Sequence, residues 1–295
     1  YRLLKQLAPD IVVTHSSTDA WVLAIARCFL VKPPIMIRMR HVRASVQVNL
    51  MTRWMYQQAV MTVTTSEDIR RHLIERLCLP DSRVVSVPTG VDAEVFCAAS
   101  QSEREIIRHR LKMRDEHTHV LMVSTLRSWK GHDSVLVALQ DLPRVRLHIV
   151  GDGPQDALLR ARVKELHIAN QVVFWGHHAD VASFYQAADL FLQPSLRHEG
   201  VSQSLLQAGA CEVPVIASDI GGLNEVIEHE ISGLLVEPGS SQAVFDAIDT
   251  CLKQPGSAAK RARMLKARIL KQHTLGAMAD RMERIYEQAM AGVMQ

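Results

Sequence analysis

The sequence predicts an α/β protein built on parallel sheets. Short runs of β-branched and apolar residues recur along its 295 residues, and stretches with helical spacing separate them. Several runs are apolar on both faces, which is typical of parallel strands covered by helices on both sides. Strands that alternate with helices in this way indicate right-handed βαβ units. The expected strands are Ile11–Thr14, Ile35–Met39, Met61–Thr64, Val84–Val87, Val120–Ser124, Arg146–Val150, Val172–Trp175, Leu190–Leu192, Val215–Ser218 and Gly233–Val236.

The alternation is interrupted once, between Asp92 and Thr118. This region offers a polar stretch and then a basic helical segment, Glu103–Met113, but no strand. We therefore place the domain junction here, with a first domain over residues 1–97 and a second over residues 98–272. The first has four expected strands, which is short for a doubly wound domain, and the second has six.

The two ends of the chain carry further expectations. The opening YRLLKQLAPDIVVTH reads as the end of a helix followed by a strand, as if a domain were entered partway. The final segment, residues 273–295, has apolar residues at helical spacing over Leu275–Met290, and we expect this helix to pack across both domains.

Composition narrows the class of protein. Hydrophobic residues make up 47% and charged residues 22%, as in ordinary globular proteins, and a net charge of +3 is too small for a nucleic-acid-binding protein. Five widely separated cysteines favour reduced thiols in a cytoplasmic protein. The basic stretch from Arg38 to Tyr56 has two interpretations: peripheral contact with a membrane surface, or a buried helix with a solvated basic face.

Ligands of open α/β sheets bind beyond the carboxyl ends of the strands, so the residues that follow each strand are the candidates. In TLRSWKGHD, after Val120–Ser124, Arg127 and Lys130 could meet a phosphate beside a helix start, or could be two solvated charges. Gly151 and Gly153 of GDGP allow a close ligand approach or a plain turn. His177 lies in the loop GHHAD, which we expect to touch a ligand through its backbone.

The stretch RHEGVSQSLLQAG places Glu199 and Gly200 just before an expected helix, with Gln207 inside it. The free N–H groups of residues 201–203 would form an anion site at the helix start, and Ser202 could cap the helix instead. Glu199 would repel a bare phosphate but would accept hydrogen bonds from hydroxyls. A ligand with both phosphates and hydroxyls is a nucleotide sugar, and Gln207 is also within reach of hydroxyls.

The first half offers His15 after one expected strand, and Arg40 with His41 after the next. Histidines at equivalent strand ends favour function modestly over a structural role. No Asp-x-Asp pair occurs in the sequence, so a metal held between two nearby carboxylates is not visible.

Taken together, the segments WKGH, GDGP, FWGHHADV, ADLFLQPS, EGVSQSLLQA, PVIASDIGGLNE and GLLVEPG resemble the C-terminal domain of family-4 retaining glycosyltransferases of the GT-B fold. TTSEDIRRHL and VPTGVDAEVF are similar to that family's segment before the interdomain linker. The resemblance covers nearly the whole chain. It implies two Rossmann-like domains facing a cleft, the first one incomplete here because the family's opening strand and Gly-rich loop do not precede Tyr1.

The same resemblance implies roles for individual residues. Lys130 would contact the donor diphosphate and stabilise the leaving phosphate, Glu199 would contact the donor sugar, and His41 would lie near the reacting sugar. The backbone at Gly200 and Val201 would meet sugar or phosphate oxygens. The remaining candidates are Ser202, Gln207, Gly151, Gly153 and His177 for the donor, and His15 and Arg40 on the acceptor side.

Two positions depart from the family pattern. Thr125 stands where the family has an arginine five residues before the lysine, and we expect Arg127 to replace it. Gln207 stands where the family has a second glutamate that accepts hydrogen bonds from ribose hydroxyls. Because Gln lacks the charge, we expect weaker or altered ribose binding.

The resemblance implies transfer of a hexose from a UDP-, GDP- or ADP-sugar to a glycan or lipid-linked acceptor, without a metal or other cofactor. The setting would be synthesis of lipopolysaccharide or another cell-surface polysaccharide, in the cytoplasm or at the inner face of the membrane. Two alternatives remain: a nucleotide-sugar 2-epimerase on a similar fold, and a non-catalytic nucleotide-binding fragment, since the chain as given could be inactive through truncation.

Overall fold

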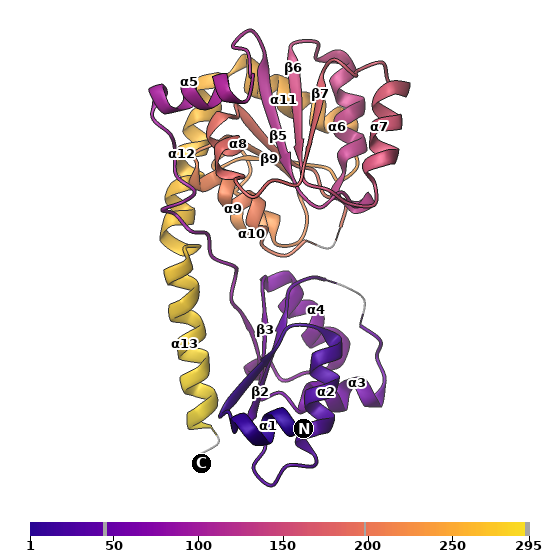
Figure 1. The fold of residues 1–295 in the computed structure, drawn as a ribbon, viewed down its shortest axis with the longest axis vertical. Coiled ribbons are helices and arrows are strands. Elements are labelled where there is room, and N and C mark those ends of the chain that lie inside the picture. The colour runs from indigo at the N-terminus through magenta and orange to yellow at the C-terminus, as the bar shows by residue number, and fades with distance from the viewer. Residues whose placement is uncertain (44–45, 198, 293–295) are drawn as a thin grey trace. The chain divides into compact units, whose positions relative to one another are not determined.

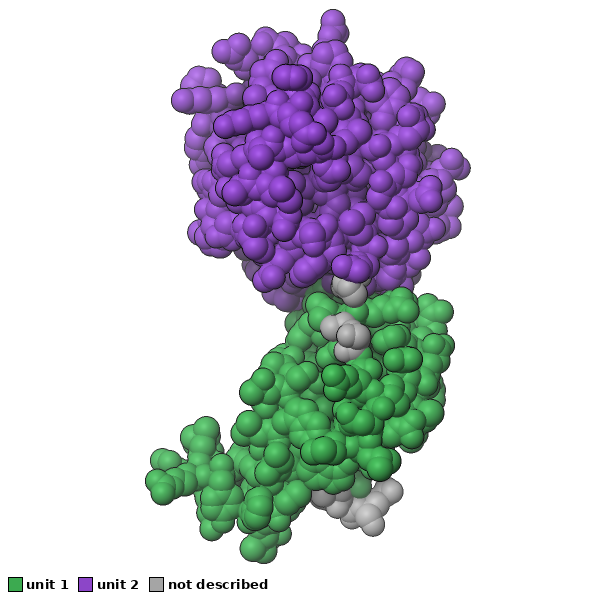
Figure 2. Space-filling model, turned by 90° about the vertical axis from the view of Figure 1, so that its right-hand side faces the viewer, with its two compact units in different colours: residues 1–89, 276–295 green, residues 90–275 purple. Residues whose placement is uncertain are grey.

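A computed structural model describes residues 1–43, 46–197 and 199–292. The chain divides into two compact units, one formed by Tyr1–Thr89 with Gly276–Gln295 and the other by Gly90–Leu275 (Figure 2). The division after Thr89 falls earlier in the chain than the junction expected at residue 97. Val91 explains the position, because its backbone exchanges hydrogen bonds with His273 and Leu275 at 2.8 and 3.0 Å and so belongs to the second unit.

The first unit contains a four-stranded parallel sheet in the order β1-β2-β3-β4 (Figure 1). Three of its helices begin at a side chain that accepts a hydrogen bond from the first turn: Ser16, Asn49 and Ser66. The strands are β1 (Ile11–Thr14), β2 (Ile35–Arg40), β3 (Met61–Thr64) and β4 (Val84–Ser86), and the helices are α1 (Arg2–Leu7), α2 (Ser17–Arg27), α3 (Leu50–Gln57), α4 (Glu67–Leu77) and the short 3₁₀ turn η1 (Asp81–Arg83).

Alternate residues of β2 supply the two faces of this sheet. Met36 packs with residues of α2, α3 and α4 in one core, whereas Ile35 and Ile37 pack against the chain's last helix, α13 (Leu275–Ala291), in another. Ile285 of α13 is buried there, with 4% of its surface exposed. The end of the sequence therefore completes the first unit.

The second unit contains a six-stranded parallel sheet in the order β10-β9-β8-β5-β6-β7. Strand order reverses between β5 and β8, which are adjacent in space and paired at Val120–Leu190. Such a reversal is where doubly wound sheets bind their ligands. The strands are β5 (Thr118–Val123), β6 (Val145–Val150), β7 (Val172–Gly176), β8 (Leu190–Gln193), β9 (Val215–Ser218) and β10 (Leu234–Val236).

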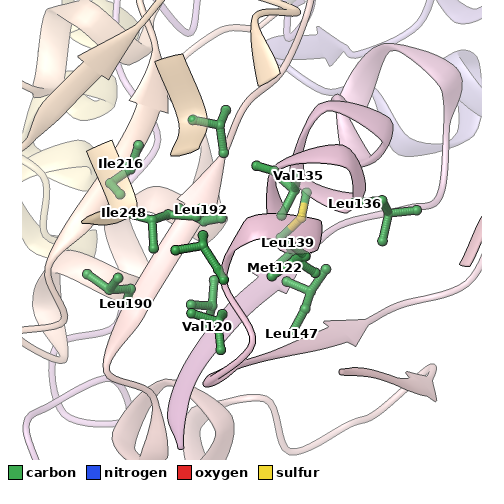
Figure 3. Packing of buried hydrophobic residues seen from close by; sticks show 14 of the residues in the cluster. Val120, Met122, Val135, Leu136, Leu139, Leu147, Leu190, Leu192, Ile216 and Ile248 are labelled. Atoms are coloured by element: carbon green, nitrogen blue, oxygen red, sulfur yellow. The ribbon is translucent and has the colours of Figure 1, made fainter. Parts of the chain in front are cut away.

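Helices cover both faces of the second sheet. One core joins the strands to α6, α7 and α11, and Figure 3 shows Val120, Leu192 and Ile248 among its members. The other joins them to α8, α9, α10 and α12. The helices are α5 (Gln101–Arg110), α6 (His132–Ala138), α7 (Asp156–Glu165), α8 (Ala182–Ala187), α9 (Gln203–Ala210), α10 (Leu223–Val226), α11 (Ser241–Lys253) and α12 (Pro255–Gln272), with 3₁₀ turns η2 (Ser128–Lys130) and η3 (Leu139–Asp141).

All ten expected strands are confirmed, with ends that differ by at most two residues from the expected ones. One shift affects a candidate residue: Arg40 is the last residue of β2 rather than the first of the following loop. Along the described ranges, none of the helices combines the length and the apolar character that crossing a bilayer would require.

Candidate functional site

The loops after β5 and β8 bring together the two side chains that the sequence analysis ranked first. The Lys130 ammonium donates to Glu199 Oε1 at 2.6 Å, and the Ser195 hydroxyl donates to the same oxygen at 2.7 Å. Glu199 is 8% exposed and Ser195 is fully buried. Among the described residues none donates to Glu199 Oε2, so this oxygen is available to a hydroxyl. The sequence analysis missed Ser195, although its place in the loop after β8, two residues beyond the strand, was a signal.

Gly131 fixes the position of Lys130. Its backbone is left-handed, with φ of 72°, and a Cβ built there would lie 1.8 Å from the carbonyl oxygen of Pro194. Only glycine permits this approach of the β5 loop to the β8 loop. The Leu196 N–H also donates to the Trp129 carbonyl at 2.7 Å. The two loops are therefore locked together next to the ion pair.

Gly222 contacts the backbone at Glu199 and Gly200. A Cβ at Gly222 would lie 2.2 Å from the Gly200 carbonyl carbon, and the Gly222 N–H donates to the Glu199 carbonyl at 3.1 Å. The loop after β9 is thus packed against the segment from Glu199 to Val201. Ser202 occupies the N-cap position of α9, but its side chain makes no capping hydrogen bond.

Gly151 and Gly153 bring the loop after β6 against the loop after β5. A Cβ would lie 2.0 Å from Ser124 O at the first position and 2.6 Å from Leu126 O at the second. The Leu126 N–H donates to the Asp152 carbonyl at 2.7 Å. Because a side chain at either position would clash with the loop after β5, both positions require glycine.

Gln207 is the fifth residue of α9 and accepts a hydrogen bond from the Tyr185 hydroxyl at 3.0 Å. Tyr185 is fully buried, and burial raises its pKa well above the usual value. The phenol therefore stays protonated and keeps donating to the Gln207 carbonyl. The amide N–H₂ remains as a donor group, whereas a glutamate here would offer an additional acceptor.

Arg127 and His177 lie at the periphery of these loops. Arg127 is exposed, and its guanidinium lies over the Trp129 ring, 5.6 Å from the centroid. Arg127 also lines a cavity of about 500 Å³ together with His132, Gln155 and Arg162. His177 is exposed in the loop that follows β7.

His132, the last residue of WKGH, is a buried neutral base behind the site. Burial, followed by the charge of Lys130, lowers its pKa to about 4. Its Nε2 lies 3.3 Å from the Ser124 hydroxyl. The sequence analysis gave this residue no role.

The candidates of the first unit lie together at the carboxyl ends of β1 and β2. His15 Nδ1 and His41 Nε2 are 2.9 Å apart, and the rings are stacked with centroids 5.2 Å apart. The pKa of His41 lies below its usual value, mainly through partial burial and then through the charge of His15. Arg40 precedes His41, and its carbonyl accepts a hydrogen bond from the Thr65 N–H at 3.2 Å.

A metal centre is not formed by the described part of the chain, where no three His, Cys, Asp or Glu side chains are grouped closely enough to hold an ion.

Comparison with known families is decisive for identity. Residues 103–270 match the family described as "Glycosyl transferases group 1", and residues 1–95 match the one described as "Glycosyltransferase Family 4". The chain belongs to the group 1 glycosyl transferases. Its first unit carries the family-4 pattern, so the resemblance seen in the sequence is confirmed, as is the GT-B architecture of two Rossmann-like domains.

Two curated relatives of this group 1 glycosyl transferase are named for the transfer of different sugars. N-acetyl-alpha-D-glucosaminyl L-malate synthase of Bacillus anthracis is 28% identical over 209 residues, which is 70% of this chain and 54% of that protein. A GDP-mannose-dependent alpha-(1-6)-phosphatidylinositol monomannoside mannosyltransferase of Mycobacterium tuberculosis is 32% identical over 181 residues, 57% of this chain and 46% of that protein. The chain thus spans about half the length of the curated relatives it matches.

A solved structure supports the fold of this glycosyl transferase. Anabaena HepE in complex with UDP-glucose superposes with a TM-score of 0.86 and 24% sequence identity, over 95% of this chain and 79% of that one. At this identity the likeness shows the fold alone.

Proposed function

We propose that this chain is part of a retaining glycosyltransferase that moves a hexose from a nucleotide-diphosphate donor to a glycan or lipid-linked acceptor. The observation that carries the proposal is the Lys130–Glu199 pair. It joins the loops after β5 and β8, where the strand order reverses, and it places a cation beside a carboxylate whose second oxygen has no donor among the described residues.

The roles follow from the charges of the pair. The Lys130 ammonium has three N–H donors and gives one to Glu199, so, as far as the described residues go, two remain for the donor diphosphate. Charge develops on the diphosphate as it leaves, and a fixed cation there lowers the barrier. Glu199 Oε2 would accept a hydrogen bond from a hydroxyl of the donor sugar. Arg127 would add a second cation at the phosphates, and the backbone at Gly200 and Val201 would meet the sugar.

The transfer step is balanced without a metal or other cofactor. The acceptor oxygen forms a bond to the anomeric carbon on the face from which the diphosphate departs, and the bond from that carbon to the phosphate oxygen breaks. The acceptor proton passes to a departing phosphate oxygen. In this proposal His41 lies near the reacting sugar, and His15 and Arg40 help to bind the acceptor.

The donor is a UDP-, GDP- or ADP-sugar in this proposal. HepE binds UDP-glucose, and the mycobacterial relative is named as GDP-mannose-dependent, so neighbours of this chain differ in the base they use. We propose synthesis of lipopolysaccharide or another cell-surface polysaccharide on the cytoplasmic side of a membrane. A peripheral contact would use the exposed Val48, Leu50 and Met51 near Arg53.

A panel of UDP-, GDP- and ADP-sugars, with turnover followed by release of the nucleoside diphosphate, tests the proposal. Lys130→Ala should lower the turnover about 10²–10³-fold, since a positioned donor to developing charge is worth that much. Lys164→Ala, which removes an exposed lysine of α7, is the matched control and should leave turnover unchanged. Wild-type rates in Lys130→Ala would refute the assignment.

The same assay separates the alternatives. A 2-epimerase would convert the donor without any acceptor, and a non-catalytic module would bind nucleotides in calorimetry without releasing product. Either result would replace glycosyl transfer as the function.

A further inference from the structure

The first unit contains a buried guanidinium for which the described residues provide no carboxylate. Arg38 of β2 is 2% exposed. Its Nη1 lies 3.3 Å from the Met55 sulfur, its guanidinium carbon lies 4.5 Å from the centroid of the Tyr56 ring, and its Nε has no hydrogen-bond partner. A thioether and a ring face are weak substitutes for an anion, and a buried charge without a counter-ion is costly.

Tyr56 connects this arginine to a cavity of about 520 Å³. Tyr56 is 3% exposed and lines the cavity, and its hydroxyl also has no hydrogen-bond partner. The Arg38 guanidinium lies over its ring face, so the positive charge is close to the hydroxyl. The cavity therefore adjoins one buried positive charge and one unused hydroxyl.

The other lining residues add positive charge and hydroxyls. Arg53 and Arg83 line the cavity, as do Ser82 and Thr62, and no aspartate or glutamate is among the described residues of its lining. Within the described residues, the Arg53 side chain contacts the Cys78 sulfur, at 3.8 Å, and its buried Nε has no hydrogen-bond partner. Asp81, the carboxylate nearest to Arg83 in the sequence, forms an ion pair with Arg70 instead.

The cavity is distinct from the candidate residues His15 and His41 of the same unit. It is lined by residues from the C-terminal ends of α3 and α4, from the start of β3, and from the segment that includes η1 and leads into β4. These positions mark the amino end of the parallel sheet, whereas His15 and His41 follow the carboxyl ends of β1 and β2.

We propose that this cavity is a binding site for a phosphate group, held by Arg53, Arg83 and the Tyr56 hydroxyl, with Arg38 supplying further positive charge behind the ring. Arginine forks match the geometry of phosphate oxygens. The group can belong to a free phosphorylated molecule or to a lipid headgroup, and the chemistry of recognition is the same. Exposed Leu50 and Met51 begin the helix that carries Arg53 and Tyr56.

The test uses the full chain in a Lys130→Ala background, which removes the cation of the proposed donor site and keeps the two sites distinguishable. Inorganic phosphate binding is measured by calorimetry, and binding to phosphatidylcholine vesicles with and without phosphatidylglycerol is measured by co-sedimentation. Substituting both Arg53→Gln and Arg83→Gln should weaken anion binding at least about tenfold, and Tyr56→Phe should weaken it about three- to tenfold.

Arg71→Gln, which removes an exposed arginine of α4 outside the cavity, is the control and should change binding less than about twofold. Binding of phosphate, of anionic vesicles or of both, lost in the double variant, supports the proposal and identifies the source. Absence of both, or equal binding by the double variant and Arg71→Gln, overturns it.

Discussion

At the scale of single residues, Glu199 shows how a buried charge is retained in the site. Its Oε1 accepts hydrogen bonds from the Lys130 ammonium and the Ser195 hydroxyl. These bonds offset much of the cost of removing a carboxylate from water. Oε2 has no such partner among the described residues. A group left available in an otherwise paired, buried side chain is a reason to expect a ligand there rather than a purely structural ion pair.

Gln207 allows a direct test of the expected ribose contact. Gln207→Glu would keep an acceptor for the Tyr185 hydroxyl and would add a charged oxygen for a ribose hydroxyl. A charged acceptor gains about 1 kcal/mol over a neutral one, so UDP should bind roughly fivefold more tightly in calorimetry. Leu158→Glu, an exposed position on α7, adds the same charge elsewhere in the second unit as a control. Unchanged affinity in Gln207→Glu would leave Gln207 as a helix residue only.

His148 makes the stability of the second unit depend on pH. It accepts from Trp175 Nε1 at 3.0 Å and lies 2.9 Å from His119, and burial, followed by the charge of His119, lowers its pKa to about 3. The unfolded chain, with a pKa near 6.5, binds the proton that the folded chain excludes. Stability is therefore fully present above pH 6.5 and falls as the pH drops below it.

For His148 alone this loss is about 2 kcal/mol between pH 7 and pH 5. Urea unfolding at the two pH values measures it. His148→Asn, which keeps an acceptor for Trp175, should reduce the pH 7 to pH 5 difference by about that amount. His177→Asn, at an exposed histidine, should leave the difference as in the wild type. An unchanged difference in His148→Asn would contradict the account.

At the scale of elements, the loops after β5 and β8 are joined by Gly131, and an added methyl group tests that contact. Gly131→Ala would clash with the Pro194 carbonyl and would strain a backbone with φ of 72°. We expect a loss of about 1–3 kcal/mol in unfolding free energy and, because Lys130 would move away from Glu199, at least tenfold weaker donor binding.

Gly239→Ala is the matched control for Gly131→Ala. Gly239 has φ of 81°, yet a Cβ there would meet only Leu196 Cδ2 at 3.5 Å. Backbone strain of about 1–2 kcal/mol should follow without loss of donor binding. If both variants bound the donor equally well, the glycine contact would not be what positions Lys130.

The strands and the loops after them differ in how well the sequence predicts them. Periodicity and apolar runs predicted every strand, because buried parallel strands must be apolar on both faces. Lys130 and Glu199 were each assigned to the donor from strand ends and family resemblance, whereas the ion pair between them was not predicted. Ser195, His132 and the Tyr185–Gln207 bond were not predicted, because each depends on the conformation that loops and helices adopt once the sheet has assembled, which periodicity does not reveal.

At the scale of the whole molecule, the chain has separate cores, and α13 connects the end of the sequence to the first of its two units. Ile285 and Ala289 are buried against Ile35, Ile37, Met61 and Val63. Shortening Ile285 to Ala should cost the first unit about 2–5 kcal/mol, because a cavity replaces a packed side chain. Hydrogen exchange should then accelerate in β2 and β3.

The second unit has its own cores, so its slowest-exchanging amides in β5 and β6 should keep their wild-type rates in Ile285→Ala. Glu287→Ala, on the exposed side of the same helix, should leave both units unchanged. Faster exchange in β5 and β6 of Ile285→Ala would mean that the units unfold as one cooperative body. Unaltered exchange in β2 and β3 would mean that α13 contributes little to the first unit.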